Sequence, residues 1–230
     1  MTPDEAVSSR LTPSAFVAAT AAELPAPTEF TEHEIKLIRG TYTSIARLGT
    51  QLSLRGISRE IGVSPGLLVY HFGSHENLLL QTMTWALQST VGRIRRHVRE
   101  ADARQHDAVT SLSALLDAVF VSPEENRDFY LVYLDLIQNS VRHSTFSGLA
   151  EVVRAHINGS YAVVIAAGVE SGEFQVADVA SAAREARSLV DGHVVQWLQR
   201  DDWRESHLLL HDDCLDSLRR LLRYEEAPQI

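Results

Sequence analysis

The apolar positions of this chain repeat every three to four residues, which is the spacing of one face of an α-helix. The first such segment opens with a capping box, in which Thr31 is followed three residues later by Glu34, and it stops at Gly49. Its apolar residues are Ile35, Ile38, Tyr42, Ile45 and Leu48. No β-hairpin signal, internal repeat or low-complexity tract interrupts the series, so the pattern predicts an all-α fold.

Caps and turn residues divide the rest of the pattern into further helices, for about nine in all. We predict them over about residues 53–61, 64–72, 74–98, 109–121, 122–137, 146–169, 179–197 and 205–224. The helix that begins at Ser74 is long enough to leave one domain and enter the next. We therefore predict a domain at 30–80 and a second helical domain at 81–224, with a mobile acidic arm at 1–29 and a flexible tail at 225–230.

Two short helices on either side of Gly62 carry the most specific pattern. Ser53 caps the first helix, Gly62 supplies the turn, and Ser64 followed by Pro65 begins the second helix. This is the spacing of a helix-turn-helix unit, whose second helix fits the major groove of DNA while the first contacts the phosphate backbone. Helical hairpins without a role on DNA use the same turn, so the spacing alone leaves both interpretations open.

The residues around the turn resemble those of one family. The run IGVSPGLLVYHFGSHENLL at 61–79, with LRGI at 54–57 before it, is similar to the TetR family of bacterial transcriptional regulators. The similarity rests on the Gly-Val-Ser turn, the aromatic-His-Phe sequence, and the Gly-Ser step that begins the next helix. It implies an N-terminal three-helix DNA-binding domain, a helical ligand-binding and dimerisation domain, and a homodimer that binds a double-stranded palindromic operator.

The resemblance also implies which positions contact DNA. They are Ser53, Arg55, Ser64, Pro65, Gly66, Leu67, Tyr70, His71 and His75. Ser53 and Arg55 match positions that meet phosphate or a base edge, although a cap and a surface charge would explain them as well. Family members often carry Lys or Arg at position 65, Thr at 67 and Lys at 75. Because this face is more apolar, we expect thymine methyl contacts, backbone N–H groups and DNA shape to dominate base recognition.

The net charge changes what can be expected of DNA binding. The chain carries a formal charge of −9, but residues 31–80 hold five Lys and Arg against four Asp and Glu, a balance of +1. A near-neutral DNA-binding domain is therefore joined to an acidic remainder, and we expect modest non-specific affinity for DNA. A helical adaptor that kept this domain without recognising a specific sequence is the alternative from another functional class.

The second domain contains two predicted surfaces. The last two helices are apolar over more than one stripe, as in a four-helix bundle across a dimer axis, and we predict an interface of Val194, Leu198, Leu208, Leu215, Leu218 and Leu222. A cavity for a small-molecule effector is expected among the middle helices, lined by Phe120, Phe129, Tyr133, Asn139, His143, Tyr161 and Trp197. Internal core is the alternative in both cases, and the pattern names no particular effector.

Other functions receive less support from the sequence. His207, His211 and Cys214 fall at i, i+4 and i+7, which keeps a metal-responsive sensor as an alternative, yet no second cluster supplies a fourth ligand, and we predict neither metal nor cofactor. The sequence has no Gly-rich phosphate loop, nucleophile elbow or spaced carboxylate pair, which argues against an enzyme. No apolar run approaches a membrane span, and the acidic residues 1–29 do not resemble a signal peptide. We predict a cytoplasmic, ligand-responsive transcriptional regulator, most typically a repressor that a small molecule releases from its operator.

Overall fold

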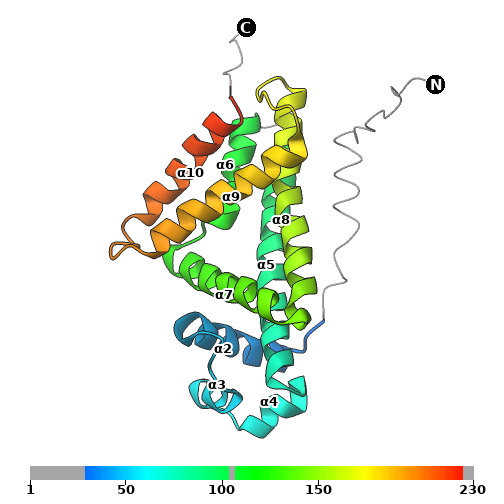
Figure 1. Ribbon diagram of the computed structural model, residues 1–230, viewed down its shortest axis with the longest axis vertical. Helices are drawn as coiled ribbons and strands as arrows, with labels where there is room; N and C mark the ends of the chain where they lie inside the picture. Colours follow the sequence, from blue (N-terminus) through cyan, green and yellow to red (C-terminus); the bar gives the residue numbers. More distant parts are fainter. Residues whose placement is uncertain (1–28, 104–106, 225–230) are drawn as a thin grey trace, which may run out of the picture.

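The computed structural model of this chain describes residues 29–103 and 107–224 (Figure 1). Within these residues the chain forms nine α-helices and no strand, as the periodicity predicted. The helices are α2 Glu32–Leu48, α3 Leu54–Ile61, α4 Pro65–Phe72, α5 His75–Ala103, α6 Ala108–Val119, α7 Pro123–Arg142, α8 Ser144–Glu170, α9 Val179–Leu198 and α10 His207–Leu221. The predicted tail and, apart from Glu29, the predicted arm lie outside the described residues.

The helix ends follow from short-range capping. Thr31 and Glu34 form both hydrogen bonds of the predicted capping box at the start of α2. Asp107, Ser122 and Asp178 each accept a backbone N–H with the side chain at the starts of α6, α7 and α9. These caps satisfy backbone donors that a helix cannot satisfy internally. All nine helices begin within a few residues of their predicted positions, although α8 and α10 begin without a side-chain cap.

Helix α2 and the two short helices α3 and α4 lie together at one end of the molecule, which we call the head (Figure 1). Helix α5 begins beside α4 and continues out of the head into the other helices, which we call the body (Figure 1). Helix α7 crosses the body next to the head and packs on α2. A single cluster of buried apolar side chains continues from the head into the body, so the two parts share a packed junction.

Helix α8 is the central helix of the body and corrects one sequence prediction. It packs against α5, α6, α7 and α9. By length and mean hydropathy, 1.3 over its most apolar 18 residues, it could cross a membrane, whereas the apolar pattern of the sequence predicted no segment that approached a membrane span. More than half of that window is buried inside the body. Its apolar character therefore matches the core position it occupies.

Candidate DNA-binding surface and effector cleft

Helices α3 and α4 are joined by the predicted turn. Gly62 has φ of +73°, in the left-handed region, and its N–H bonds to the carbonyl of Ser58. The Ser53 hydroxyl accepts the Gly56 N–H at 3.2 Å, and the Ser64 hydroxyl accepts the Leu67 N–H at 3.2 Å. Both serines thus act as caps and are exposed, which leaves their second acceptor lone pairs and their O–H groups for other partners.

The two faces of α4 differ sharply. Leu68 and Phe72 are buried against the rest of the head. On the opposite side Pro65 and Gly66 are exposed, and the Tyr70 side chain is 83% exposed. Leu67 is half-buried. An aromatic side chain left this open on a helix of suitable length is available to a groove or to phosphate oxygens.

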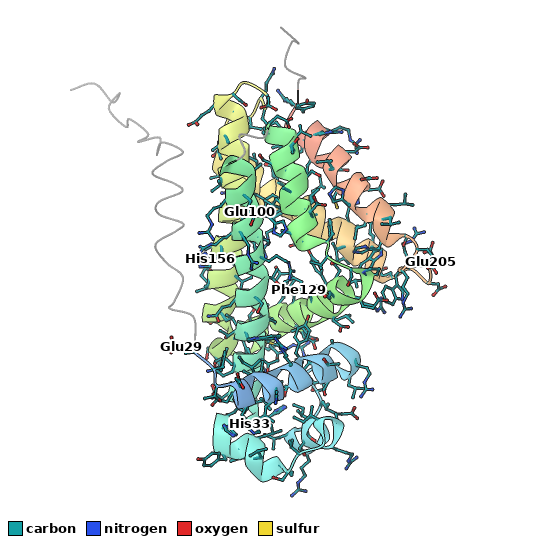
Figure 2. The ribbon with its side chains drawn as sticks, turned by 180° about the vertical axis from the view of Figure 1, so that it is seen from behind. Glu29, His33, Glu100, Phe129, His156 and Glu205 are labelled. Carbon is teal, nitrogen blue, oxygen red and sulfur yellow. The ribbon has the colours of Figure 1, made fainter. Side chains whose placement is uncertain are left out.

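The structure places His71 differently from the outward position expected of it. Its Nδ1 lies 3.5 Å from the Glu34 carboxylate of α2, its ring centroid is 5.1 Å from that of His33, and its side chain is only 18% exposed. Figure 2 marks His33 in the head. Hydrogen bonds from Thr31, followed by the contact with His71, lower the pKa of Glu34. The contacts of His71 therefore brace α4 against α2, and its ring, 5.1 Å from that of Tyr70, also supports the Tyr70 ring.

His75 departs from the expectation as well. It is the first residue of α5 and is half-buried. Its Nε2 is buried and has no hydrogen-bond partner among the described residues. This atom does not face a DNA backbone.

Helix α3 carries two exposed cations of the head, and Lys36, Arg39 and Arg47 are exposed on α2. Arg55 is exposed, as expected, and Arg59 is exposed one turn later. Arg47 of α2 is already bound to the carboxylate of Glu60. Arg59 was not among the predicted contacts, although its i, i+4 spacing from Arg55 would have placed it beside that residue on α3.

The body contains an open cleft of about 490 Å³ between α7, α8 and α9. Its size falls within the range of small-molecule sites. It is lined by Tyr133, Leu136, Ile137 and Ser140 of α7, by Ser147, Ala150, Glu151, Arg154 and Asn158 of α8, and by Arg184, Arg187, Ser188 and Asp191 of α9. One wall is therefore mainly apolar, and the other two carry polar groups.

Arg187 organises the polar side of this cleft. Its Nε donates to Asp191 at 3.3 Å, its Nη1 donates to Asn158 at 3.4 Å, and its Nη2 donates to the Tyr133 hydroxyl. Burial raises the pKa of Asp191, and Arg187 opposes that change. Burial likewise raises the pKa of Tyr133. Side chains from α7, α8 and α9 thus form one hydrogen-bonded cluster in a partly buried wall of the cleft.

Of the seven predicted pocket residues, Tyr133 alone lines this cleft. Phe129 stacks on Tyr133 one turn earlier, with planes 2° apart, and Figure 2 marks it on α7. Tyr161 is core. Phe120 and Trp197 are buried around His207, with ring centroids 6.2 and 5.4 Å from it. Aromatic spacing along the sequence does not distinguish such core positions from a cleft.

Asn139 and His143 are also outside the cleft. Asn139 donates from Nδ2 to the Thr50 hydroxyl of the head at 3.3 Å. Asp135, one turn earlier on α7, accepts the Thr50 backbone N–H at 3.0 Å. His143 is exposed between α7 and α8. Asn139 and His143 were predicted to contact a ligand. In the structure, Asn139 instead connects the body to the head.

The predicted dimer residues divide into two groups. Val194, Leu218 and Leu222 are fully buried within the protomer, so they belong to its own core and not to a surface. Leu198 and Leu215 are partly buried. Leu208 is 80% exposed, and two further apolar residues are exposed, Leu209 beside it on α10 and Val195 on α9. The outward apolar surface of α9 and α10 is therefore smaller than predicted.

The histidine and cysteine positions of α10 are held by other contacts. His207 is buried beside Trp197, and burial lowers its pKa. His211 lies 3.3 Å from Asp117 and 3.1 Å from Asp212. Cys214 is fully buried, and burial raises the pKa of its thiol to about 12, which disfavours the thiolate that a metal requires. Among the described residues no group of three or more His, Cys, Asp or Glu side chains is placed to hold a metal ion.

Comparison with known proteins agrees with this architecture. A curated relative, the HTH-type transcriptional regulator BetI of Vibrio campbellii, is 31% identical over 87 residues, which are 37% of this chain and 43% of that relative. The match thus covers less than half of the relative's length.

Solved structures extend the similarity to most of the chain. A transcriptional regulator from Saccharomonospora viridis, solved in complex with choline, has a TM-score of 0.71 and 23% identity over 82% of this chain and 96% of its own. A TetR transcription regulator from Haloarcula marismortui has a TM-score of 0.69 and 20% identity over 84% and 98%. Residues 108–223 match the family described as the C-terminal domain of BetI-type transcriptional repressors. The chain therefore belongs to the TetR family of transcriptional regulators, with a C-terminal domain of the BetI type.

Proposed function

We propose that this protein is a cytoplasmic, dimeric regulator that binds a palindromic operator through α4 and leaves it when a small molecule occupies the body. The match of the C-terminal domain to a repressor family supports a role in regulating transcription, and the exposed face of α4 supports DNA binding by the head. In this proposal Tyr70, Arg55 and the first turn of α4 contact DNA. Arg59 joins them as a phosphate contact.

The observation that carries the proposal is that one helix serves both sites. Helix α7 contributes Tyr133, Leu136, Ile137 and Ser140 to the cleft. The same helix binds Thr50 of the head through Asp135 and Asn139. A ligand that shifts α7 changes these contacts, so it can favour one orientation of the head over another.

Helix α5 offers a second connection. Near its start the Asn77 side chain donates to the Phe72 carbonyl at the end of α4, at 2.8 Å. Movement of α5 therefore carries the end of the recognition helix with it. A typical allosteric coupling of about 1–3 kcal/mol would lower operator affinity about 5- to 150-fold.

The dimer in this proposal forms through α9 and α10. The exposed side chains of Val195, Leu208 and Leu209 are apolar and lie on these helices. Because one short helix contacts few base pairs, a two-fold pair of heads is needed to recognise two half-sites in successive major grooves.

The proposal is tested by selecting genomic fragments with the purified protein at physiological salt. We expect enrichment of one palindrome and a loss of affinity of about 5- to 150-fold in Tyr70→Ala, corresponding to about 1–3 kcal/mol. The matched control is Val141→Ala, because Val141 is also 83% exposed but lies at the end of α7 in the body. No enriched sequence with or without cell-extract metabolites, or equal losses in both variants, would refute specific recognition through α4 and favour the adaptor.

A further inference from the structure

The charges of the cleft do not follow those of the chain. The protein carries a formal charge of −9, yet the cleft is lined by three guanidinium groups, those of Arg154, Arg184 and Arg187, and by two carboxylates. Cationic groups thus outnumber anionic ones at this one hollow. Because a concave site concentrates the field of the charges that line it, this excess favours an anionic occupant.

Both carboxylates of the cleft are already bound to arginine. Asp191 accepts from Arg187, whose side chain is only 11% exposed, and Glu151 is bound to Arg154. An incoming cation would have to compete with these guanidinium groups. The cation would also lack an open aromatic face, because Tyr133, the one aromatic residue of the lining, has the Arg187 guanidinium 5.8 Å from its ring centre.

Arg184 is the guanidinium that remains available. It donates from Nη2 to the Ser181 hydroxyl at 2.8 Å and forms no ion pair within residues 29–103 and 107–224. A guanidinium has five N–H donors, so most of those of Arg184 are left for a ligand. Ser188 lies one turn later on the same helix and also lines the cleft. The Ser188 hydroxyl already donates to the Arg184 carbonyl at 2.8 Å, so the planar Arg184 guanidinium itself offers the paired donors matched to the two oxygens of a carboxylate.

The wall formed by α7 sets the rest of the ligand. Leu136 and Ile137 line it, and Ala150 of α8 adds a further apolar surface. Ile137 is exposed although it is apolar. A ligand with a hydrocarbon chain would cover this side chain and remove its apolar surface from water.

We propose that the cleft between α7, α8 and α9 binds an aliphatic carboxylate, with its carboxylate on Arg184 and its hydrocarbon chain on Leu136 and Ile137. Binding of this ligand is inferred from the cleft alone, and only its role as the effector rests on the proposed function. The proposed ligand is an anion, whereas choline, the ligand of the Saccharomonospora viridis structure, is a cation. The excess of arginine over carboxylate in the cleft favours the anion.

The binding test uses the full chain without DNA. Hexanoate, octanoate and decanoate are titrated calorimetrically at neutral pH, with choline and 1-octanol as comparison ligands. We expect the carboxylates to bind, with affinity rising about twofold per added methylene because the chain is partly buried in an open cleft. Octanol and choline should bind at least tenfold more weakly than octanoate. Tighter binding of choline, or no binding of any carboxylate at millimolar concentration, would overturn the inference.

Variants locate the site. Arg184→Glu should weaken octanoate binding more than tenfold, and the milder Arg184→Gln should weaken it by a smaller factor without introducing repulsion. Arg99→Glu makes the same charge change at an exposed position of α5 outside the cleft and should leave binding unchanged. Equal affinity in all four proteins would place the carboxylate elsewhere and refute the assignment. Circular dichroism confirms that each variant is folded.

Two further measurements separate this inference from its alternatives. If the cleft were instead covered by a second copy of the chain, Arg184→Glu would change the dimer dissociation constant in ligand-free sedimentation, and that result would count against a ligand. Operator binding is measured separately. Octanoate binding without any operator would refute the proposed function alone, whereas an operator without carboxylate binding would refute this inference alone.

Discussion

The head and the body are built from the same kind of amphipathic helix, but they differ in how their functional residues are specified. In the head, the eight residues of α4 include both buried and exposed positions, such as Leu68, which is buried, and Tyr70, which is exposed. In the body, the cleft is assembled from three helices whose residues span Tyr133 to Asp191. A local pattern therefore identifies most of a recognition helix, whereas a cleft depends on how distant helices pack.

The largest expected effect tests the inward face of the head. Leu68→Ala removes a fully buried side chain and should lower the free energy of unfolding by about 2–5 kcal/mol. Its neighbour Val69 is exposed, so Val69→Ala should stay within about 0.5 kcal/mol. Urea denaturation of both variants measures the difference. Similar values for the two would mean that α4 is not packed with the face described above.

The turn of the head gives the next effect. Gly62 has a positive φ and no atom within 4 Å of where a Cβ would stand, so Gly62→Ala should cost about 1–2 kcal/mol through backbone strain alone. Gly92 has equally open space but lies within helix α5, where alanine is favoured. Gly92→Ala should therefore stabilise by about 0.5–1 kcal/mol. Thermal unfolding that shifted in the same direction for both would contradict the left-handed turn.

The junction between head and body should show a smaller effect on stability and a larger one on coupling. Asp135→Ala removes the acceptor of the Thr50 N–H and should cost about 1 kcal/mol. It should also reduce the ratio of operator affinities measured without and with effector. Gln138→Ala, at an exposed position of α7, is the control. An unchanged ratio in Asp135→Ala would show that α7 does not transmit the signal, and would leave α5 as the route.

The smallest effect concerns the pH dependence of the body. Burial raises the pKa of Asp191 above its unfolded value of about 3.9. The folded state then holds the proton more tightly than the unfolded state, so this group favours folding at low pH and loses that contribution as pH rises through the folded pKa. Asp191→Asn should therefore become more stable relative to the unchanged protein between pH 4 and pH 7, as followed by urea denaturation.

Glu151 should behave in the opposite way. Its hydrogen bond with Arg154 lowers the pKa of its carboxyl, so the stability it contributes is present above the unfolded pKa and is lost as pH falls through the folded pKa. Glu151→Gln is thus the matched control for Asp191→Asn. The same direction of change in both variants would mean that Arg187 outweighs the burial of Asp191.

The sequence predicted the helices well, but it did not predict which residues of the body line its cleft. Seven of the nine helices in the described residues begin with a side-chain cap, and only α8 and α10 begin without one. The capping residues are Thr31, Ser53, Ser64, Ser74, Asp107, Ser122 and Asp178. The exposed face of α4 was predicted as well, with the exception of His71 and of the position of His75 at the start of α5. The roles of both histidines were carried over from the family resemblance. In this structure, however, His71 contacts Glu34, and the Nε2 atom of His75 is buried.

In the body, apolar spacing identified which residues face inward, but it did not distinguish the core of the protomer from a ligand pocket or a dimer interface. Phe120, Tyr161, Trp197, Val194, Leu218 and Leu222 are all core, although some were predicted as pocket and others as interface. The cleft instead contains arginine, serine and carboxylate groups that have no periodic signal. Asn139 looked like a ligand contact in the sequence, and it binds a residue of the head instead.

By itself, the sequence determined the helical fold, the positions of the caps and turn, the recognition helix and the family resemblance, because each of these depends on residues within about four positions of one another. Tertiary structure alone decided that Arg187 would meet Tyr133 and Asp191, that Arg184 would remain without an ion pair among the described residues, and that Thr50 would meet α7. These contacts join residues far apart in the chain. Their geometry is set by the packing of whole helices, which no local spacing encodes.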